Sequence, residues 1–333
     1  MISTFTTALL DWFAHYGREL PWRQTRDPYA IWLSEVILQQ TRIQQGRDYW
    51  ARFMQRFPTV ELLAAASEDE VLRLWQGLGY YSRARNLHKA AQQVVAMGAF
   101  PSTLEGIRSL QGVGDYTAAA VASIAFDVDA AAVDGNVYRV LSRYYGVATP
   151  INTPQGKRDF TQLASSLLPA GKAGTFNQAL MDFGAIQCTP RSPRCVICPL
   201  VETCEAVRSG RVGELPVKRP KTKVQERRLA YIYIRYKGKV AIHRRGPGDI
   251  WQGLWEPLLM EGDAQFDTAQ PMVLLAEDVR HVLTHRILLA DFYLVEAKEK
   301  PSLPEGYQWI DESELDRYAK PRLVERLLER LPD

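Results

Sequence analysis

Four cysteines in one short segment constrain this chain more than any other feature of its sequence. They are all the cysteines in the 333 residues, and six, two and five residues separate Cys188, Cys195, Cys198 and Cys204. Such clustering in a reducing compartment is typical of metal ligation, whereas disulfides are typical of secreted chains. Thiolates suit both zinc and an iron–sulfur cluster. Only one close pair of cysteines is present, which favours the cluster over zinc.

The composition is that of a folded globular protein. Apolar residues make up 46% of the chain and charged residues 24%, and no segment is apolar enough to span a membrane. We find no signal peptide and expect a cytoplasmic protein, bacterial and associated with the nucleoid by its function. The net charge of +3 is small. Its excess is densest in residues 209–226, which fits either a solvated basic linker or contact with a polyanion.

The length and the hydrophobic pattern predict two domains. Residues 1–208 show successive amphipathic helical patterns, interrupted at glycines and prolines, so we expect an all-α domain. Residues 209–226 contain glycine, proline and basic residues and few apolar ones, which indicates a linker. Short β-prone segments dominate residues 227–333, followed by a helical pattern over 312–331, so the second domain is predicted to be α+β.

A glycine turn joins two predicted helices in the region of residues 105–125. Gly112 and Gly114 allow another molecule to approach the backbone closely, and amide groups at the start of the next helix can bind a phosphate. An ordinary connection between two helices is the alternative interpretation.

Two carboxylates are candidates for catalysis. Asp134 stands where a helix begins, so it is a candidate N-cap, and the same position favours an ionised carboxylate that could stabilise a cationic sugar. Glu35 lies in an apolar helical segment, where loss of water would raise its pKa and suit a general acid. The alternative for Glu35 is an exposed residue on a polar stripe.

Together these features resemble the helix-hairpin-helix DNA glycosylases, specifically the MutY-type adenine DNA glycosylases of base excision repair. The resemblance covers nearly the whole chain. Its strongest segments are residues 32–41, 77–87, 112–117 and 134–137 and the four cysteines. It implies an all-α helix-hairpin-helix glycosylase domain over 1–208 with an iron–sulfur loop at 188–204. A Nudix-like α+β lesion-recognition domain would follow over 227–333.

The resemblance also implies an activity and a cofactor. The four cysteines would hold a 4Fe-4S cluster. The enzyme would hydrolyse the N-glycosidic bond of adenine mispaired with 8-oxoguanine or guanine in duplex DNA, after the base is flipped out. Relatives of the endonuclease III type carry a lyase lysine where this chain has Tyr116, so the resemblance implies a monofunctional glycosylase.

Catalytic roles follow from the same resemblance. Glu35 would protonate N7 of the flipped adenine. Asp134 would stabilise the oxocarbenium-like sugar or bond to it transiently, and Tyr116 and Asn136 would support that centre.

DNA contacts are implied as well. Gln40 and Tyr80 are similar to residues that wedge into the duplex at the mispair, although Tyr80 could instead be a core residue. Thr284 and His285 stand in the place of the family's Phe-Ser-His loop that reads 8-oxoguanine, and Leu283 departs from its phenylalanine. The second domain lacks the Nudix catalytic motif, so it is expected to recognise rather than hydrolyse.

Two other functions stay open at this point. One is a pyrimidine-lesion glycosylase, against which Tyr116 argues. The other is a non-catalytic, metal-stabilised DNA-binding protein, which would need neither Glu35 nor Asp134. We expect a monomer that binds double-stranded DNA and no membrane.

Overall fold

The computed structural model describes residues 3–220, 225–261, 271–283 and 286–332. It separates into two compact units. The helical unit comprises Met1–Ala65 and Lys89–Pro220, and the sheet unit comprises Ala66–His88 and Lys221–Asp333. Among the described helices, none combines the length and the hydropathy that crossing a membrane requires. The predicted boundaries at residues 208 and 226 stay predictions.

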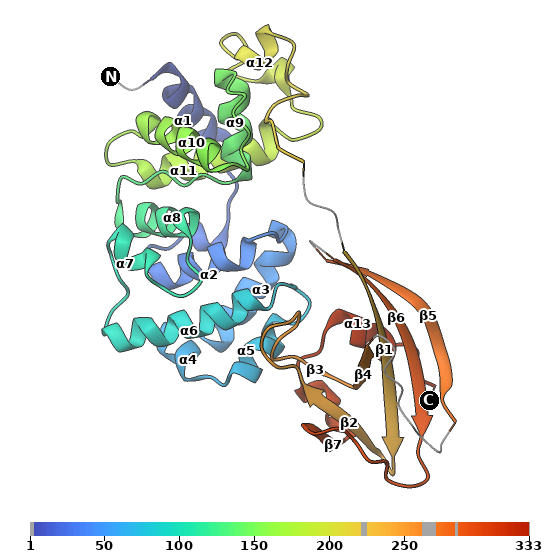
Figure 1. Ribbon diagram of the computed structural model, residues 1–333. Helices are drawn as coiled ribbons and strands as arrows, with labels where there is room; N and C mark the ends of the chain where they lie inside the picture. Colours follow the sequence, from blue (N-terminus) through green and yellow to red (C-terminus); the bar gives the residue numbers. More distant parts are fainter. Residues whose placement is uncertain (1–2, 221–224, 262–270, 284–285, 333) are drawn as a thin grey trace. The chain divides into compact units, whose positions relative to one another are not determined.

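Short helices build the helical unit (Figure 1). They are α1 (Thr4–Tyr16), η1 (Pro21–Arg23), α2 (Pro28–Leu38), α3 (Ile43–Arg56), α4 (Val60–Ala65), α7 (Leu104–Arg108), α8 (Asp115–Phe126), α9 (Gly135–Tyr145), α10 (Pro154–Leu167), α11 (Ala173–Asp182), η2 (Phe183–Gln187), η3 (Cys195–Ile197) and α12 (Glu205–Arg208). Helix α6 (Ser82–Met97) crosses from one unit to the other.

Helix α8 connects the two groups of helices that Figure 1 shows in this unit, because it packs against both α2 and α11. One group, α1, α9, α10 and α11, encloses a core in which Leu9, Phe160 and Phe176 are fully buried. The other side of α8 packs on α2, which is buried along almost its whole length. This packing brings the middle of α2 and the end of α11 to the same helix, α8.

The predicted glycine turn joins α7 to α8. Gly112 has φ of +76°, a left-handed conformation that glycine adopts without a steric cost. Gly114 is the N-cap of α8, so the helix begins directly after the turn with its first amide groups unpaired within the helix. The turn therefore has the geometry expected of a helix-hairpin-helix.

The sheet unit contains α5 (Glu68–Trp75), the first part of α6, and, in the described part of the chain, one seven-stranded sheet. The strands are β1 (Gln225–Tyr236), β2 (Lys239–Arg244), β3 (Trp255–Glu256), β4 (Leu258–Glu261), β5 (Val273–Val282), β6 (Arg286–Glu296) and β7 (Tyr307–Asp311). Their order is β3-β2-β1-β6-β5, with β4 also paired to β1 and β7 to β2. The central pair β1 and β6 is parallel and the other pairs are antiparallel.

Side chains that alternate along β1 are buried on both faces of this sheet. Tyr231 and Tyr233 pack in the cluster that includes Leu323 and Leu327, so α13 (Arg322–Leu328) covers that face. Ile232 belongs to a second cluster on the opposite face.

The fold class predicted from the sequence is confirmed, with one correction of detail. The helical pattern over 312–331 is divided into the 3₁₀ helix η4 (Glu312–Arg317) and α13, because Pro321 lacks an amide hydrogen and disfavours a helical residue before it.

Candidate active site

Glu35 is buried in the middle of α2, with 8% of its surface exposed. The alternative of an exposed polar stripe is therefore wrong. Burial raises the pKa of Glu35 to about 7; the hydroxyl of Tyr116 and the charge of Arg23 lower it, and the charge of Asp134 raises it. A carboxyl group with this pKa holds its proton in a large fraction of molecules at neutral pH.

Tyr116 joins the hairpin to this carboxyl group. It is the second residue of α8, and its hydroxyl lies 2.9 Å from Glu35 Oε2. The same hydroxyl lies 3.0 Å from Met181 Sδ, near the end of α11. Burial and the neighbouring acids raise the pKa of Tyr116 well above its ordinary value, so it stays a neutral hydroxyl.

Asp134 is the N-cap of α9, as its place in the sequence predicts. Its Oδ1 accepts from the amides of Asn136 at 2.9 Å and Val137 at 2.8 Å, and its Oδ2 accepts from Asn136 Nδ2 at 2.7 Å. Burial raises the pKa of Asp134 above its ordinary value, and these hydrogen bonds offset that rise only in part. The carboxylate is thus fixed in one orientation by three N–H donors.

Glu35 and Asp134 line the same cavity, together with Tyr116 and Asn136. All four predicted catalytic residues therefore come together, although they derive from α2, α8 and the start of α9. A proton donor and a fixed carboxylate around one cavity are the groups that glycosidic bond hydrolysis uses.

An ion-pair cluster that includes two residues lining this cavity, Arg18 and Arg23, was missed by the sequence analysis. Asp182, at the end of α11, is fully buried and accepts from Arg18 Nε at 3.0 Å and from Arg23 Nη1 at 2.8 Å. Burial would raise the pKa of Asp182, but the hydrogen bonds from both arginines hold it below its ordinary value. An acid in an otherwise apolar helical segment is the signal that could have revealed Asp182, as it revealed Glu35.

Hydrogen bonds continue from the active site to the cysteine segment. Arg139 on α9 donates from Nη2 to Asn136 Oδ1 at 2.9 Å and from Nε to the carbonyl of Cys188 at 2.8 Å. One turn further, Arg143 Nη1 lies 3.4 Å from Cys188 Sγ. Helix α9 thus holds the active-site carboxylate at its start and the first cysteine along its side.

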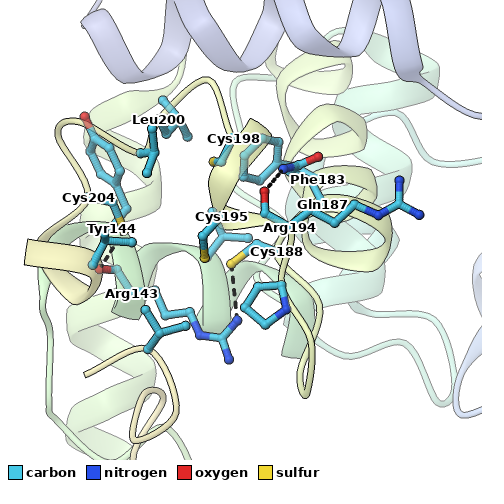
Figure 2. Close-up of a pocket in the computed structure, with 15 residues that line it drawn as sticks. Arg143, Tyr144, Phe183, Gln187, Cys188, Arg194, Cys195, Cys198, Leu200 and Cys204 are labelled. Atoms are coloured by element: carbon cyan, nitrogen blue, oxygen red, sulfur yellow. Dashed lines mark hydrogen bonds between the residues drawn. The ribbon is translucent and has the colours of Figure 1, made fainter. Parts of the chain in front are cut away.

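The four cysteines are free thiols that surround one pocket (Figure 2). Leu200, Phe183 and Val140 supply apolar walls. Burial, with the nearby cysteines, raises the pKa of Cys198 to about 11. Among the described residues, no three His, Cys, Asp or Glu side chains converge closely enough to hold a single metal ion.

The predicted DNA-contact residues lie at turns. Gln40 follows the end of α2 with φ of +58°, and Tyr80 precedes α6 with φ of +48°, a conformation that is uncommon for residues other than glycine. Tyr80 is 48% exposed, so the alternative of a core tyrosine is wrong. Thr284 and His285 lie outside the described residues.

A second pocket lies within the sheet unit. It contains Tyr80, Trp251 and His281, with the last two rings in edge-to-face contact at 5.7 Å between centroids. Its other lining residues are Gly77, Leu78, Gly79, Tyr81, Ser82, Arg85, Asp249, Ile250, Val282, Leu283, Arg286 and Arg322.

Comparisons with known proteins agree with this geometry. Residues 33–165 match the model of the HhH-GPD superfamily base excision DNA repair proteins, and residues 230–330 match the NUDIX domain. An adenine DNA glycosylase of Buchnera aphidicola subsp. Acyrthosiphon pisum is 30% identical over 98% of this chain and 97% of its own length. The chain belongs to the adenine DNA glycosylase family.

A second relative supports this assignment, and a solved structure agrees with the fold of the helical unit. An adenine DNA glycosylase of Buchnera aphidicola subsp. Schizaphis graminum is 33% identical over 76% of this chain and 74% of its own. Among solved structures, a thermostable thymine-DNA glycosylase is 34% identical, with a TM-score of 0.58 over 62% of this chain and 95% of that one. This adenine DNA glycosylase family member is thus a DNA repair enzyme that hydrolyses N-glycosyl bonds, and the matched region 33–165 contains Glu35, Tyr116 and Asp134.

Proposed function

We propose that this enzyme removes adenine mispaired with 8-oxoguanine or guanine from duplex DNA, and that it leaves the strand uncut. The observation that carries the proposal is the pairing of two carboxyl groups in one cavity. Glu35 has a pKa near 7, and Asp134 is held by three N–H donors. One hydroxyl group donates to Glu35, whereas three N–H groups donate to Asp134 and favour its ionised form. Two carboxyl groups in such different surroundings are suited to act as proton donor and as stabilising anion.

Glu35 supplies the proton. A purine leaves a sugar more readily when a ring nitrogen is protonated, because the departing base then carries no negative charge. A buried acid whose pKa lies close to neutral pH is suited to donate that proton to N7. Arg23 and Tyr116 prepare the site for the carboxylate that remains, since both favour its ionised form.

Asp134 stabilises the sugar after the bond begins to break. Positive charge develops on the sugar ring, and a carboxylate fixed beside it in a site with little water lowers the energy of that state. Asn136 donates from Nδ2 to the Asp134 carboxylate and accepts at Oδ1 from Arg139. Arg139 therefore holds the amide group that fixes the carboxylate. Water then completes the hydrolysis.

Tyr116 supports a monofunctional reaction. A lyase needs an amine nucleophile to form a Schiff base with the sugar, whereas Tyr116 offers a neutral hydroxyl that is bonded to Glu35. The abasic product would therefore stay intact until alkali cleaves it.

Binding requires the adenine to leave the duplex, since its ring nitrogens are stacked and paired there. The turn at Gly112 and Gly114 can hold a backbone phosphate at the start of α8. Gln40 and Tyr80, at strained turns, are suited to fill the space that the base vacates, which offsets an unstacking cost of a few kcal/mol.

Recognition of 8-oxoguanine is assigned to the sheet unit. Its pocket combines the rings of Tyr80 and Trp251 with the guanidinium groups of Arg85 and Arg286, a combination suited to a base and a phosphate. Val282 and Leu283 line the same pocket, and Thr284 and His285, which follow directly, are proposed to read the lesion.

The four cysteines are proposed to hold a 4Fe-4S cluster. Cluster thiolates surround a space instead of converging on one ion, and the four free thiols surround one pocket with apolar walls. A cluster would anchor the loop between Cys188 and Cys204, where Arg191 and Arg194 can meet phosphates. Iron and sulfide analysis, with visible absorbance, of the purified protein and of a Cys198→Ser variant tests this assignment.

Adenine release under single-turnover conditions tests the main proposal. A duplex with one adenine opposite 8-oxoguanine is incubated with excess enzyme and divided between neutral and alkaline workup. Base release with strand cleavage only after alkali supports it. Cleavage at neutral pH would indicate a lyase, and release of a damaged pyrimidine instead of adenine would indicate the alternative substrate class.

Comparison of 8-oxoguanine with guanine opposite adenine tests lesion recognition. Replacement of Thr284 and His285 by alanine is expected to reduce the preference for 8-oxoguanine, and an unchanged preference would place recognition elsewhere.

We also propose that the enzyme acts as a monomer on chromosomal DNA in the bacterial cytoplasm. Light scattering of the purified protein would test the monomer, and imaging of a fluorescent fusion would test the location.

A further inference from the structure

The hydroxyl of Tyr116 has two acceptors within hydrogen-bonding distance and only one proton to donate. Glu35 Oε2 lies at 2.9 Å and Met181 Sδ at 3.0 Å. Met181 is partly buried, packs against the core of the helical unit and lines the active-site cavity. A thioether is a weak acceptor, and nothing in the proposed chemistry gives it a role.

The protonation state of Glu35 decides which acceptor is better. An ionised carboxylate is a much stronger acceptor than a thioether, so the hydroxyl then donates to Glu35. A protonated Glu35 can instead donate its own proton to the hydroxyl oxygen, which leaves the hydroxyl proton without that acceptor. Met181 is placed to accept it, so that no buried donor is left unsatisfied.

We propose that Met181 is a positioning residue, which accepts the Tyr116 hydroxyl while Glu35 holds its proton and releases it to the Glu35 carboxylate once that proton has left. Two O–H groups turn in this switch: the Glu35 O–H turns from the Tyr116 oxygen to the substrate base, and the Tyr116 O–H then turns from Met181 to the Glu35 carboxylate. The proton passes from Glu35 to a ring nitrogen of the base, and the switch itself forms or breaks no other covalent bond. The inference rests on the proposed role of Glu35 as the acid.

Other charged groups line the cavity with Glu35. They are Arg18 and Arg23, which precede α2, and Asp134, which precedes α9. Asp182, which directly follows Met181, ends α11. The two arginines are hydrogen-bonded to Asp182. A change at Met181 that leaves these groups in place therefore reports on the hydroxyl.

The test is the pH dependence of single-turnover adenine release by Met181→Leu. Leucine conserves volume and removes the acceptor, and such exchanges usually leave a protein folded. The rate of adenine release should fall as pH rises and Glu35 loses its proton. Loss of the hydrogen bond that stabilises the protonated form of Glu35 is expected to lower the pH at the midpoint of this fall by about 0.5 unit. Above the midpoint this corresponds to a loss of about threefold in rate. Met181→Ile, which also lacks sulfur, should give the same displacement.

A double-mutant cycle distinguishes this positioning role of Met181 from a purely structural one. In a Tyr116→Phe background, Met181→Leu should move the midpoint no further, because no hydroxyl is present to switch. An equal loss of rate at every pH, or an equal displacement in both backgrounds, would overturn the inference while the glycosylase assignment stands. Failure of the unmodified enzyme to release adenine would instead refute the proposed function.

Discussion

Two buried acids of the helical unit behave in opposite ways. Glu35 on α2 receives a hydrogen bond from a hydroxyl, and burial raises its pKa to about 7. Asp182 on α11 is buried as well, yet Arg18 and Arg23 hold its pKa below the ordinary value. Both lie in apolar helical segments, so burial alone does not explain the difference.

The partners of each acid account for the contrast. Two guanidinium groups donate directly to Asp182, which makes its charged form the stable one. Arg23 acts on Glu35 only through its charge, and that effect is smaller than the cost of removing the carboxylate from water. The cavity thereby contains an acid that can give up a proton, Glu35, and two arginines whose guanidinium groups are held by the buried Asp182.

The largest expected effect comes from Glu35→Gln. Glutamine keeps the shape of the protonated side chain but cannot donate an acidic proton, so single-turnover adenine release should fall by about 10²–10⁴-fold. Binding to the mispaired duplex, measured by fluorescence anisotropy, should be preserved. Turnover at the unmodified rate would remove Glu35 as the acid.

Asp182→Asn should destabilise the folded protein, whereas Glu35→Gln should not. It leaves Arg18 and Arg23 without the carboxylate that both now contact, and breaking a buried pair in this way costs roughly 3 kcal/mol. Urea denaturation followed by circular dichroism measures the loss. A variant as stable as the original would show that solvent replaces this carboxylate at little cost.

The two acids should also give opposite pH dependence of stability. The folded-state pKa of Glu35 is raised from 4.5 to about 7, so the folded protein binds more protons in that window and its stability falls as pH rises. Glu35→Gln should therefore stabilise the protein by roughly 1–3 kcal/mol at pH 8 and by little at pH 4. Asp182 contributes to stability with the opposite sign, because its folded-state pKa is lowered. This stabilisation is fully present above pH 3.8, the ordinary pKa of the carboxyl group, and is lost as the pH falls further. Urea denaturation at both pH values compares the variants.

Asp127→Asn provides the smallest effect and a matched control for Asp182→Asn. Asp127 pairs with Arg26 at 2.8 Å, but the two side chains are 60% and 67% exposed. The same chemical change should therefore cost less than about 1 kcal/mol in urea denaturation. A cost equal to that at Asp182 would mean that burial does not distinguish the two pairs.

Much of the site could be predicted because its signals are local. The glutamate in the apolar segment of α2, the N-cap Asp134, the turn at Gly112 and the clustered cysteines each stand out within a few residues of sequence. The resemblance to known glycosylases added the roles of Asn136 and Tyr116. The residues that stayed hidden are Arg18, Arg23, Met181 and Asp182. They come from two segments that lie far apart in the chain and become neighbours only in the fold.

The fold class, the glycine turn and the residue types of the site could be predicted from the sequence, because periodicity, capping and glycine turns act over a few residues. Which acid keeps a proton depends on the packing of the folded chain. The pKa of a carboxyl group depends on burial and on the donors that packing brings to it, and α2, α8 and α11 meet through contacts between distant segments. Local sequence cannot specify those distances, so it could name Glu35 as a candidate but not set it apart from Asp182.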